Sequence, residues 1–499
     1  MSHISVTDEV VPQAYLIHAK HTFIYRTPSV YRVLTGQIII SMKLFRRKRP
    51  KKIRKPVRDP LQVIALGFAL IILIGAFVLT LPVSSRTGQP TNFITALFTA
   101  TTSTCVTGLV VVDTFTHWSF FGQCVILVMI QIGGMGFMLM LAALSIFVGR
   151  KITIRERVLI GKSISLDSMS GIVRLSKRII ASMFFVEGFG AVILALRFTK
   201  DFPLKTAIWK GVFHSVSAFC NAGIDTLGEI GGPFCSLAPY AGDFTVTMTV
   251  ALLVILGGLG FYVWDDVLSY KEGRRLSLHS KLVLTTTTAL LAGGTIFYLI
   301  AEWSNPLTLQ NKNIFDKILL SFFQSASTRT AGMDQLGQAN LTPASTVMTM
   351  LLMFIGGSPG STAGGVKTVT VTLLILTAIN TLRGRNSIVV YGRNLSYRYV
   401  LDAVTIIMVG VVCVFGGTLM LSMIDGVAFE AAMFECMSAF ATVGLSTGIT
   451  PTLSPLSQLL LIGMMYMGRV GIITLGLAIV VRGKKETNIR YPEGKIIVG

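Results

Sequence analysis

The sequence predicts an all-α polytopic membrane protein built from four similar units, each with two spanning helices and one shorter re-entrant helix. Two observations lead to this prediction. Of the 499 residues, 52% are hydrophobic and 13% are charged, and uncharged runs such as the 21 residues of Leu61–Leu81 occur. At 1.5 Å per residue, such a run crosses a hydrocarbon core of about 30 Å. The second observation is a sequence pattern that recurs four times.

The recurring pattern places a Phe ten residues before a Gly and fills the interval with Ser, Thr, Ala and other small residues. Its glycines are 115, 109 and 112 residues apart, and its copies are Phe98–Gly108, Phe213–Gly223, Phe322–Gly332 and Phe434–Gly444. So long a period indicates duplication of a domain-sized unit. Four such units predict four small-residue loops around one axis. A ring of backbone carbonyls from these loops could replace the water around a permeating cation.

The four units divide the chain into segments with a basic arm before them and a short tail after them. The predicted segments are an arm at 1–60, units at 61–149, 150–270, 271–384 and 385–482, and a tail at 483–499. Residues 1–60 contain no run able to span a bilayer, and Lys43–Arg58 is densely basic. This arm either lies near anionic lipid headgroups or docks onto a partner.

Each unit begins with an apolar run long enough to span, followed by a segment of about 14 residues that is too short to cross. The predicted first helices are Leu61–Leu81, Ile179–Leu196, Leu282–Ala301 and Ala403–Ile424. The predicted re-entrant helices are Thr91–Thr104, Thr206–Phe219, Ile314–Ser327 and Ala428–Phe440. Irregular backbone at this depth requires burial in protein or a wet cavity, so the loops after the re-entrant helices line one or the other.

The second spanning helices are predicted at Trp118–Val148, Phe244–Trp264 and Leu456–Val481, with an interrupted helix in the third unit. Eight crossings place both termini on the same side. The positive-inside rule puts the termini and the basic connections in the cytoplasm and the four re-entrant loops outside. The basic residues that carry this prediction fall in Arg150–Arg178, Lys271–Lys281, Arg383–Arg398 and the tail.

The net charge of +21 does not indicate nucleic-acid binding, because the basic residues lie beside spanning segments and lack interleaved aromatics. The six cysteines show no zinc-binding spacing and imply no disulfide framework. Glu187 lies inside a predicted spanning helix. An acid at this depth is a functional candidate, although a hydrated interior surface would also accommodate it, and both interpretations stay open.

Each second helix carries a glycine cluster: QIGGMGF at Gln131–Phe137, LGGLGF at Leu256–Phe261, IGGSPGS at Ile355–Ser361 and MGRVGI at Met467–Ile472. Close helix packing explains the first two.

In the third unit, Gly356–Gly365 contains Pro359 and five glycines, so a continuous helix is not expected there. A nucleotide-binding P-loop does not fit, because Val366 separates the glycines from Lys367 and no strand precedes them. A flexible gate across a pore is the favoured interpretation.

In the fourth cluster, Arg469 replaces the second glycine. An Arg near mid-membrane costs about 2.5–3.5 kcal/mol, so it should face protein or water. A snorkelling or structurally paired Arg is one interpretation. In the other, its charge repels cations below the carbonyl ring and its donors hold the glycine-rich loop. Lys367 is a weaker candidate for the same region.

The loops TCVTGL, FCNAGI, TRTAGM and ATVGLSTG, together with GGSPGSTAGG and MGRVG, resemble the superfamily of Trk, Ktr and HKT potassium transporters over about Leu61–Val481. The resemblance implies four membrane–pore–membrane units around a pseudo-fourfold pore. It assigns a potassium-binding selectivity filter to Val106, Thr107, Gly108, Asn221, Ala222, Gly223, Thr330, Ala331, Gly332, Thr442, Val443 and Gly444. It assigns a gate to Gly356, Gly357, Ser358, Pro359, Gly360, Ser361, Thr362, Ala363, Gly364, Gly365 and Arg469.

Within this superfamily the sequence is most similar to KtrB-type membrane subunits, since residues 1–60 cannot supply the two extra crossings typical of the Trk branch. Such subunits usually form homodimers in the cell membrane on a cytosolic nucleotide-binding ring of KtrA-like subunits. The resemblance implies potassium as substrate, no covalent cofactor, and uptake often favoured by sodium. Gly108, where sodium-preferring relatives have Ser, favours potassium.

Three other kinds of function compete with a gated potassium pore. A sodium-conducting or sodium–potassium cotransporting relative is the near alternative. A membrane enzyme would need clustered acids, His or Cys at the membrane boundary, whereas the six histidines are dispersed. A non-conducting structural protein is disfavoured, because packing alone does not explain four re-entrant loops.

Overall fold

A computed structural model describes residues 60–136, 139–140, 172–270, 275–385 and 387–471. The predicted basic arm, the tail and most of the first connection lie outside these residues. Four described helices are long and apolar enough to cross a membrane: α3 (Pro60–Thr80), α9 (Ile172–Phe198), α14 (Leu278–Ala301) and α18 (Tyr397–Asp425). They correspond to the four predicted first helices.

Three of these long helices, α9, α14 and α18, begin several residues before their predicted start, because helical backbone continues past the apolar run into the basic residues. Arg174, Lys177 and Arg178, for example, lie in α9 and not in a loop. Lys281 likewise lies in α14 and Arg398 in α18. Hydropathy marks where a helix enters lipid and not where its hydrogen bonding begins, which explains the difference.

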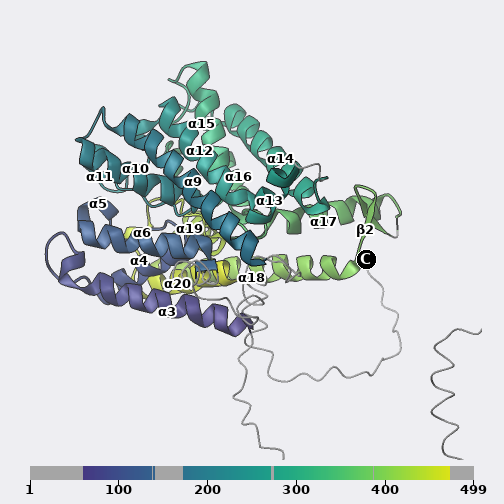
Figure 1. Ribbon diagram of the computed structural model, residues 1–499, viewed down its shortest axis with the longest axis horizontal. Coiled ribbons are helices and arrows are strands. Elements are labelled where there is room, and N and C mark those ends of the chain that lie inside the picture. Colours follow the sequence, from purple (N-terminus) through teal and green to yellow (C-terminus); the bar gives the residue numbers. More distant parts are fainter. Residues whose placement is uncertain (1–59, 137–138, 141–171, 271–274, 386, 472–499) are drawn as a thin grey trace, which may run out of the picture. The chain divides into compact units, whose positions relative to one another are not determined.

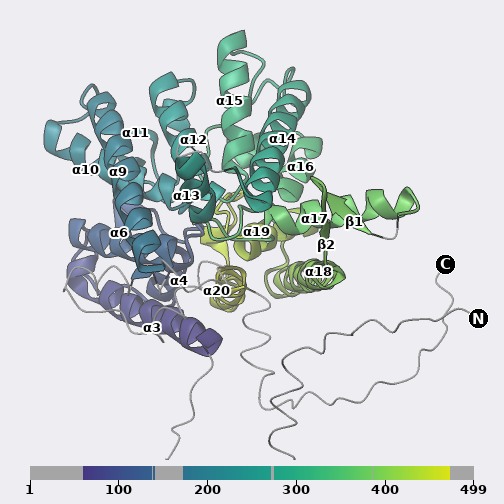
Figure 2. The same ribbon diagram turned by 45° about the vertical axis from the view of Figure 1, so that its right-hand side comes forward.

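Four short helices follow the long ones: α4 (Phe93–Cys105), α10 (Leu204–Phe219), α15 (Ile314–Ser327) and α19 (Phe429–Ala441). Each packs against the long helix that precedes it in the chain, as Figures 1 and 2 show for α3 with α4. With 13 residues, α4 is about 20 Å long and too short to cross a bilayer. Side-chain caps fix two of the starts, at Asn92 and Asn313.

The second helix of each unit is broken or ends at the glycine cluster. Gly136, Gly260 and Gly471 have φ angles of +77°, +93° and +91°, which few other residues adopt. The helices concerned are α6 (Phe120–Met135), α12 (Phe244–Leu259), α13 (Phe261–Tyr270), α16 (Pro343–Phe354), α17 (Thr368–Leu382) and α20 (Pro455–Val470).

The prediction of one continuous helix over Phe244–Trp264 is wrong, because α12 and α13 meet at Gly260 with a bend of 96°. The predicted helix Trp118–Val148 stops at Met135, and much of its remainder lies outside the described residues, as do residues 472–481 of Leu456–Val481. The interruption at Gly356–Gly365 is confirmed, since α16 ends at Phe354 and α17 begins at Thr368. By length and composition the described residues hold four spanning helices, or five if the bent pair is one span, so eight crossings stay a prediction.

Smaller elements join the helices. The third connection contains an antiparallel hairpin that the sequence did not suggest, with Val389 opposite Asn394. Its Ile388 and Val390 side chains pack against Leu282 and Leu373, so the hairpin is anchored to the helices. The remaining elements are β1 (Ile388–Val390), β2 (Arg393–Leu395), α5 (Thr114–His117), α11 (Gly228–Gly231), η2 (Pro82–Ser84), η3 (Ala238–Tyr240), η4 (Gln338–Asn340) and η5 (Thr450–Thr452).

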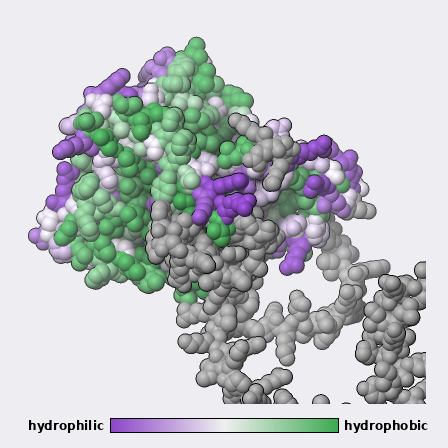
Figure 3. Space-filling view, in the orientation of Figure 1, coloured by the Kyte–Doolittle hydropathy of each residue, from purple (hydrophilic) through white to green (hydrophobic). Residues whose placement is uncertain are grey.

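The largest buried cluster surrounds the short helices. Phe98, Phe213 and Phe434, which begin three copies of the repeated pattern, are fully buried in it. Outside this cluster, hydrophobic residues cover much of the face shown in Figure 3, and Phe185 and Phe189 of α9 are among the exposed ones. An apolar exterior of this kind is what a lipid-facing surface requires.

Candidate functional site

The four repeated glycines, here called the ring glycines, lie next to one another around a closed ring. A Cβ added at Gly108 would lie 2.6 Å from the Ala222 carbonyl oxygen, and one at Gly223 would lie 2.7 Å from that of Ala331. Further along the ring, the neighbour of Gly332 is the Val443 carbonyl and that of Gly444 is the Thr107 carbonyl. Each glycine therefore meets the carbonyl oxygen of the next loop in chain order, and the fourth loop returns to the first.

All four loops enter the ring through the same strained turn. Val106, Asn221, Thr330 and Thr442, each two residues before a ring glycine, have φ angles of +57°, +61°, +64° and +52°. Left-handed backbone is unfavourable for non-glycine residues, and for β-branched ones it is a clear outlier. Strain held at one equivalent position in four loops indicates a functional constraint on the backbone.

The first and fourth loops share one pattern of hydrogen bonds. The N–H of Gly108 donates to the Thr102 hydroxyl at 2.9 Å, and the N–H of Gly444 donates to the Ser438 hydroxyl at 3.0 Å. Their φ angles of +98° and +96° also agree. In both loops, therefore, a hydroxyl of the preceding short helix satisfies the amide of the ring glycine.

The second and third loops share a different pattern. There the hydroxyl of Ser217 donates to the Ile224 carbonyl at 2.6 Å, and that of Ser327 donates to the Met333 carbonyl. The ring glycines of these loops have φ angles of +68° and +71°. The loops therefore fall into two like pairs, the first with the fourth and the second with the third, and the members of each pair are adjacent around the ring.

Several polar side-chain atoms around the ring are buried and have no hydrogen-bond partner among the described residues. They belong to Thr104, Thr107, Asn221 (Nδ2), Thr330 and Thr442. Buried polar atoms are normally hydrogen-bonded, and an exception calls for an explanation. Because the four short helices also end at the loops, their partially negative carboxyl termini favour a cation there.

Residues 356–365, here called the interrupting loop, lie against the second and fourth loops. The Thr362 hydroxyl is 2.9 Å from the Asn221 side-chain oxygen, and Gly364 lies directly against the Thr442 side chain. The loop is also tied to the elbow between α12 and α13: Ser358 N–H donates to the Gly258 carbonyl at 3.0 Å, and Phe261 N–H to the Gly360 carbonyl at 2.9 Å. The predicted gate residues thus lie next to the predicted filter residues.

Arg469 joins the interrupting loop to the first unit. One guanidinium nitrogen donates to the Thr362 carbonyl and the other to the Gly133 carbonyl. Lys367 is also engaged, because its Nζ donates to the Ala363 carbonyl at 2.7 Å. The planar, forked guanidinium suits two divergent acceptors better than an ammonium would.

In three of the four units, the glycine cluster permits one specific contact between a helix and a backbone carbonyl. A Cβ at Gly133 would collide with the Thr104 carbonyl, one at Gly257 with that of Phe219, and one at Gly468 with that of Phe440. In three units, therefore, the first glycine of the cluster lets the second helix touch the last turn of the short helix. The sequence interpretation of close packing gave no partner for these glycines.

Two buried acids lie beside the ring in different settings. Glu187 is 4% exposed and accepts hydrogen bonds from Gln131 Nε2 at 3.0 and 3.2 Å, beside Cys220 of the second loop. Glu435 in α19 accepts bonds from Ser446, Thr447 and Thr450, so it braces the chain that follows the fourth loop. Sequence reasoning singled out Glu187 but overlooked Glu435, although Glu435 lies inside the repeated pattern.

Comparison with known proteins assigns the family. Residues 30–491 match the family model of TrkH, described as a cation transport protein. The chain is 39% identical to the potassium/sodium uptake protein NtpJ of Enterococcus hirae, over 90% of this chain and 99% of that protein. It is 37% identical to Ktr system potassium uptake protein B of Bacillus subtilis, again over 90% and 99%.

The fold also resembles a solved structure. The potassium transporter TrkH from Vibrio parahaemolyticus superposes with a TM-score of 0.66 at 18% identity, covering 94% of this chain and 95% of that one. At this identity the likeness concerns the fold alone. The family assignment rests on the sequence matches, which span nearly the whole of the relatives. The chain therefore belongs to the TrkH family of cation transport proteins and is not an enzyme.

Proposed function

We propose that the chain takes up potassium across the cytoplasmic membrane through the ring, with the four loops as a selectivity filter. The observation that carries the proposal is the closed ring in which each ring glycine meets the carbonyl oxygen of the next loop. Carbonyl oxygens held in such a ring replace the hydration shell of a cation. The strained turns at Val106, Asn221, Thr330 and Thr442 hold the backbone for this purpose.

The interrupting loop and Arg469 act as the gate in this proposal. The loop touches the second and fourth loops at Asn221 and Thr442, where the chain enters the filter. Arg469 holds the loop by its Thr362 carbonyl and adds a positive charge beside the path. Moving the loop aside requires breaking these bonds, so the bonds stabilise the closed state of the gate.

The proposal includes eight crossings in four membrane–pore–membrane units, both termini in the cytoplasm, and a homodimer. A cytosolic nucleotide-binding regulatory subunit is proposed as partner, because relatives are named as parts of Ktr systems. Sodium is proposed as an activator and not as the main substrate.

A sodium-conducting pore is the second candidate, since NtpJ is named as a potassium/sodium uptake protein. Glycine in all four ring positions favours potassium, because the added Cβ of a serine would disturb the carbonyls. Competition between the two ions for uptake separates the candidates.

Growth rescue in a cell lacking potassium uptake tests the function. The parent chain should restore growth at low potassium, whereas Gly223→Val should not, because its Cβ would lie 2.7 Å from the Ala331 carbonyl oxygen. Gly293→Val is the matched control, since Gly293 has open space around it. If the parent chain, co-expressed with a Ktr-type regulatory subunit, reaches the membrane and admits no potassium, the proposal fails.

A further inference from the structure

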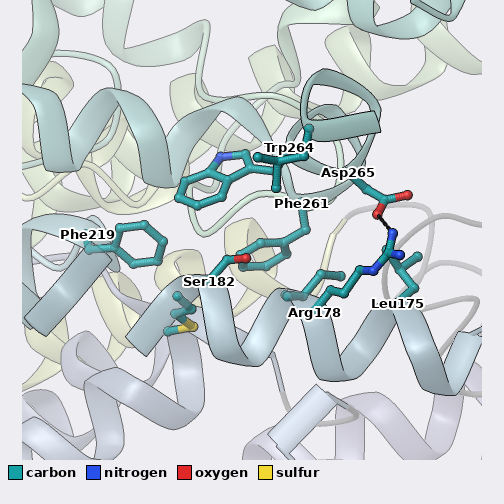
Figure 4. Close-up of a pocket in the computed structure, with 10 residues that line it drawn as sticks. Leu175, Arg178, Ser182, Phe219, Phe261, Trp264 and Asp265 are labelled. Carbon is teal, nitrogen blue, oxygen red and sulfur yellow. Dashed lines mark hydrogen bonds and ion pairs between the residues drawn. The ribbon is translucent and has the colours of Figure 1, made fainter. Parts of the chain in front are cut away.

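A narrow, half-open groove lies between α9 and α13 (Figure 4). Phe219, the last residue of α10, lies at one end, and Arg178 and Asp265 lie at the other. The lining residues are Leu175, Arg178, Ile179, Ser182 and Met183 on α9, Phe219, and Phe261, Trp264, Asp265 and Leu268 on α13. On each helix they are spaced as i, i+3, i+4 and i+7, so each wall is one helix face.

The interior of the groove is apolar and firmly held. Trp264 donates its indole N–H to the Leu256 carbonyl at 3.0 Å, and its ring meets that of Phe219 edge-on with centroids 5.9 Å apart. Ser182 is the one uncharged polar side chain among the lining residues. The walls are therefore suited to a flexible hydrocarbon and offer few polar partners.

The mouth of the groove is basic. Arg178 pairs with Asp265 at 3.3 Å, but its side chain is 55% exposed, so the pair contributes little stability. Arg174 and Lys177 are exposed on the same turns at the amino-terminal end of α9. By the positive-inside rule this end belongs to the cytoplasmic leaflet, whose anionic lipids attract such clusters.

We propose that the groove binds one acyl chain of an anionic phospholipid from the cytoplasmic leaflet, with the headgroup phosphate at Arg174, Lys177 and Arg178. The apolar walls take the hydrocarbon, and the three basic residues select the negative charge. Arg178 then exchanges its exposed pairing with Asp265 for a charge-assisted contact with phosphate.

Two residues that line the groove, Phe219 and Phe261, also hold the interrupting loop through their backbone groups. The Phe219 ring lines the groove, while its carbonyl accepts from the Thr362 hydroxyl at 3.1 Å. The Phe261 ring also lines it, while its N–H donates to the Gly360 carbonyl at 2.9 Å. A bound acyl chain holds both residues in place and so keeps the interrupting loop seated. The effect on transport rests on the proposed function, whereas the binding itself does not.

Quenching of Trp264 fluorescence by brominated acyl chains tests the binding. The full chain, with its other three tryptophans replaced by Phe, is reconstituted in vesicles that contain brominated phosphatidylglycerol or brominated phosphatidylcholine. Trp264 should be half-quenched at about a fivefold lower mole fraction of phosphatidylglycerol. Ser182→Phe, which fills the groove, should abolish the difference. Gly188→Phe adds the same ring to α9 where space is open, and should preserve it.

Two charge variants separate a lipid contact from the ion pair. Arg178→Gln should raise the half-quenching fraction of phosphatidylglycerol about fivefold, which corresponds to about 1 kcal/mol for one basic residue at an anionic surface. Asp265→Asn breaks the same ion pair but keeps Arg178, and should leave that fraction unchanged or lower it. Equal effects of the two variants would assign Arg178 to the ion pair alone and overturn the proposal.

Other outcomes also decide the matter. Equal quenching by the two phospholipids would indicate ordinary boundary lipid, and quenching by brominated free fatty acid alone would identify a different ligand. Loss of quenching at high protein-to-lipid ratio would indicate that a second copy of the chain occupies the groove. Each of these three results overturns the proposal. Potassium flux in the same vesicles should fall as phosphatidylglycerol rises, except in Ser182→Phe. If quenching is intact but flux ignores the lipid, the coupling is wrong. If there is no flux even when a Ktr-type regulatory subunit is added to the vesicles, the proposed function fails and the lipid site stands.

Discussion

The hydroxyl of Thr362 in the interrupting loop is 2.9 Å from the side-chain oxygen of Asn221 in the second loop. The same hydroxyl also donates to the Phe219 carbonyl at 3.1 Å. Asn221 is the residue that enters the ring in left-handed backbone, with φ of +61°. The break in one unit is thus bonded to the ring-forming loop of another, and displacement of the interrupting loop must disturb the ring.

Thr362→Val should raise potassium flux roughly two- to tenfold at equal protein in the membrane. The variant keeps the side-chain shape but removes the hydroxyl, and one neutral hydrogen bond is worth about 0.5–1.5 kcal/mol. Thr377→Val is the control, because the Thr377 hydroxyl bonds only to the Leu373 carbonyl of its own helix. Flux that rises equally in both variants would remove the link between this bond and gating.

Gly108→Ser should lower the preference for potassium over sodium in competition flux. The added Cβ would lie 2.6 Å from the Ala222 carbonyl oxygen and would occupy backbone with φ of +98°. Gly448→Ser is a close control, since Gly448 has φ of +96° but no neighbour within 4 Å. Backbone strain is therefore matched, and only the first variant crowds the ring. An unchanged competition profile in Gly108→Ser would take Gly108 out of the filter.

Arg469→Ala should raise flux, because it releases the Thr362 carbonyl and removes a positive charge. Arg469→Lys distinguishes these causes. It keeps the charge but cannot reproduce the fork that reaches both Thr362 and Gly133. Flux in the Lys variant close to that of Ala indicates that the tether dominates, and flux close to the parent indicates that the charge does. If neither variant alters flux at equal surface amounts, Arg469 has a structural role only.

The elements nearest the ring were the easiest to predict. The short helix Ile314–Ser327 has its predicted bounds, and the break at Gly356–Gly365 lies where it was predicted. Both signals are local: a segment too short to cross, and glycines with a proline in a spanning run. The ring itself follows from a repeat that can be read directly from the chain.

Features that depend on backbone angles or distant partners could not be predicted. The cluster at Leu256–Phe261 is compatible with a straight, closely packed helix, and nothing local shows that Gly260 takes φ of +93° and turns the chain by 96°. The contact of Gly133 with the Thr104 carbonyl joins two helices of one unit, and the Arg469 contact with Gly133 joins two units. Such pairings require the folded arrangement.

Asp225, just beyond the second loop, should make stability depend on pH. Its pKa is raised to about 6, and burial is the main cause. The hydrogen bond from the Leu227 N–H opposes this rise, as does the positive charge of Lys210, whereas the negative charge of Asp113 adds to it. An unfolded chain releases this proton near pH 4. Between pH 4 and 6 the folded state holds more protons, so the free energy of unfolding falls as pH rises, by no more than about 3 kcal/mol.

Asp225→Asn should therefore be more thermostable than the parent above pH 6, with the difference shrinking toward pH 4. Thermal unfolding midpoints of the purified protein between pH 4 and 8 measure this. Asp402→Asn, at an exposed carboxylate, should leave the parent's pH profile unchanged. A constant difference across the whole range would mean that Asp225 acts through packing and not through its charge.

The last prediction concerns the proposed regulatory subunit. The hairpin of β1 and β2 is anchored by Ile388 and Val390, so it presents basic side chains on a fixed support. The exposed ones in this connection and the next helix are Arg383, Arg385, Arg393 and Arg398. A fixed basic surface suits an acidic partner face, and complementary charge mainly raises the rate of association.

The double variant Arg393→Glu and Arg398→Glu should reduce co-purification of a co-expressed Ktr-type regulatory subunit and the nucleotide response of flux. Lys200→Glu with Lys312→Glu, at exposed positions predicted on the outer side, changes the net charge equally and should alter neither. An ungated potassium pore would let the ion run down its gradient whenever the membrane depolarised, so control is needed. Full, nucleotide-responsive transport by this chain alone in liposomes would contradict the need for a partner, because control would then reside in the chain itself.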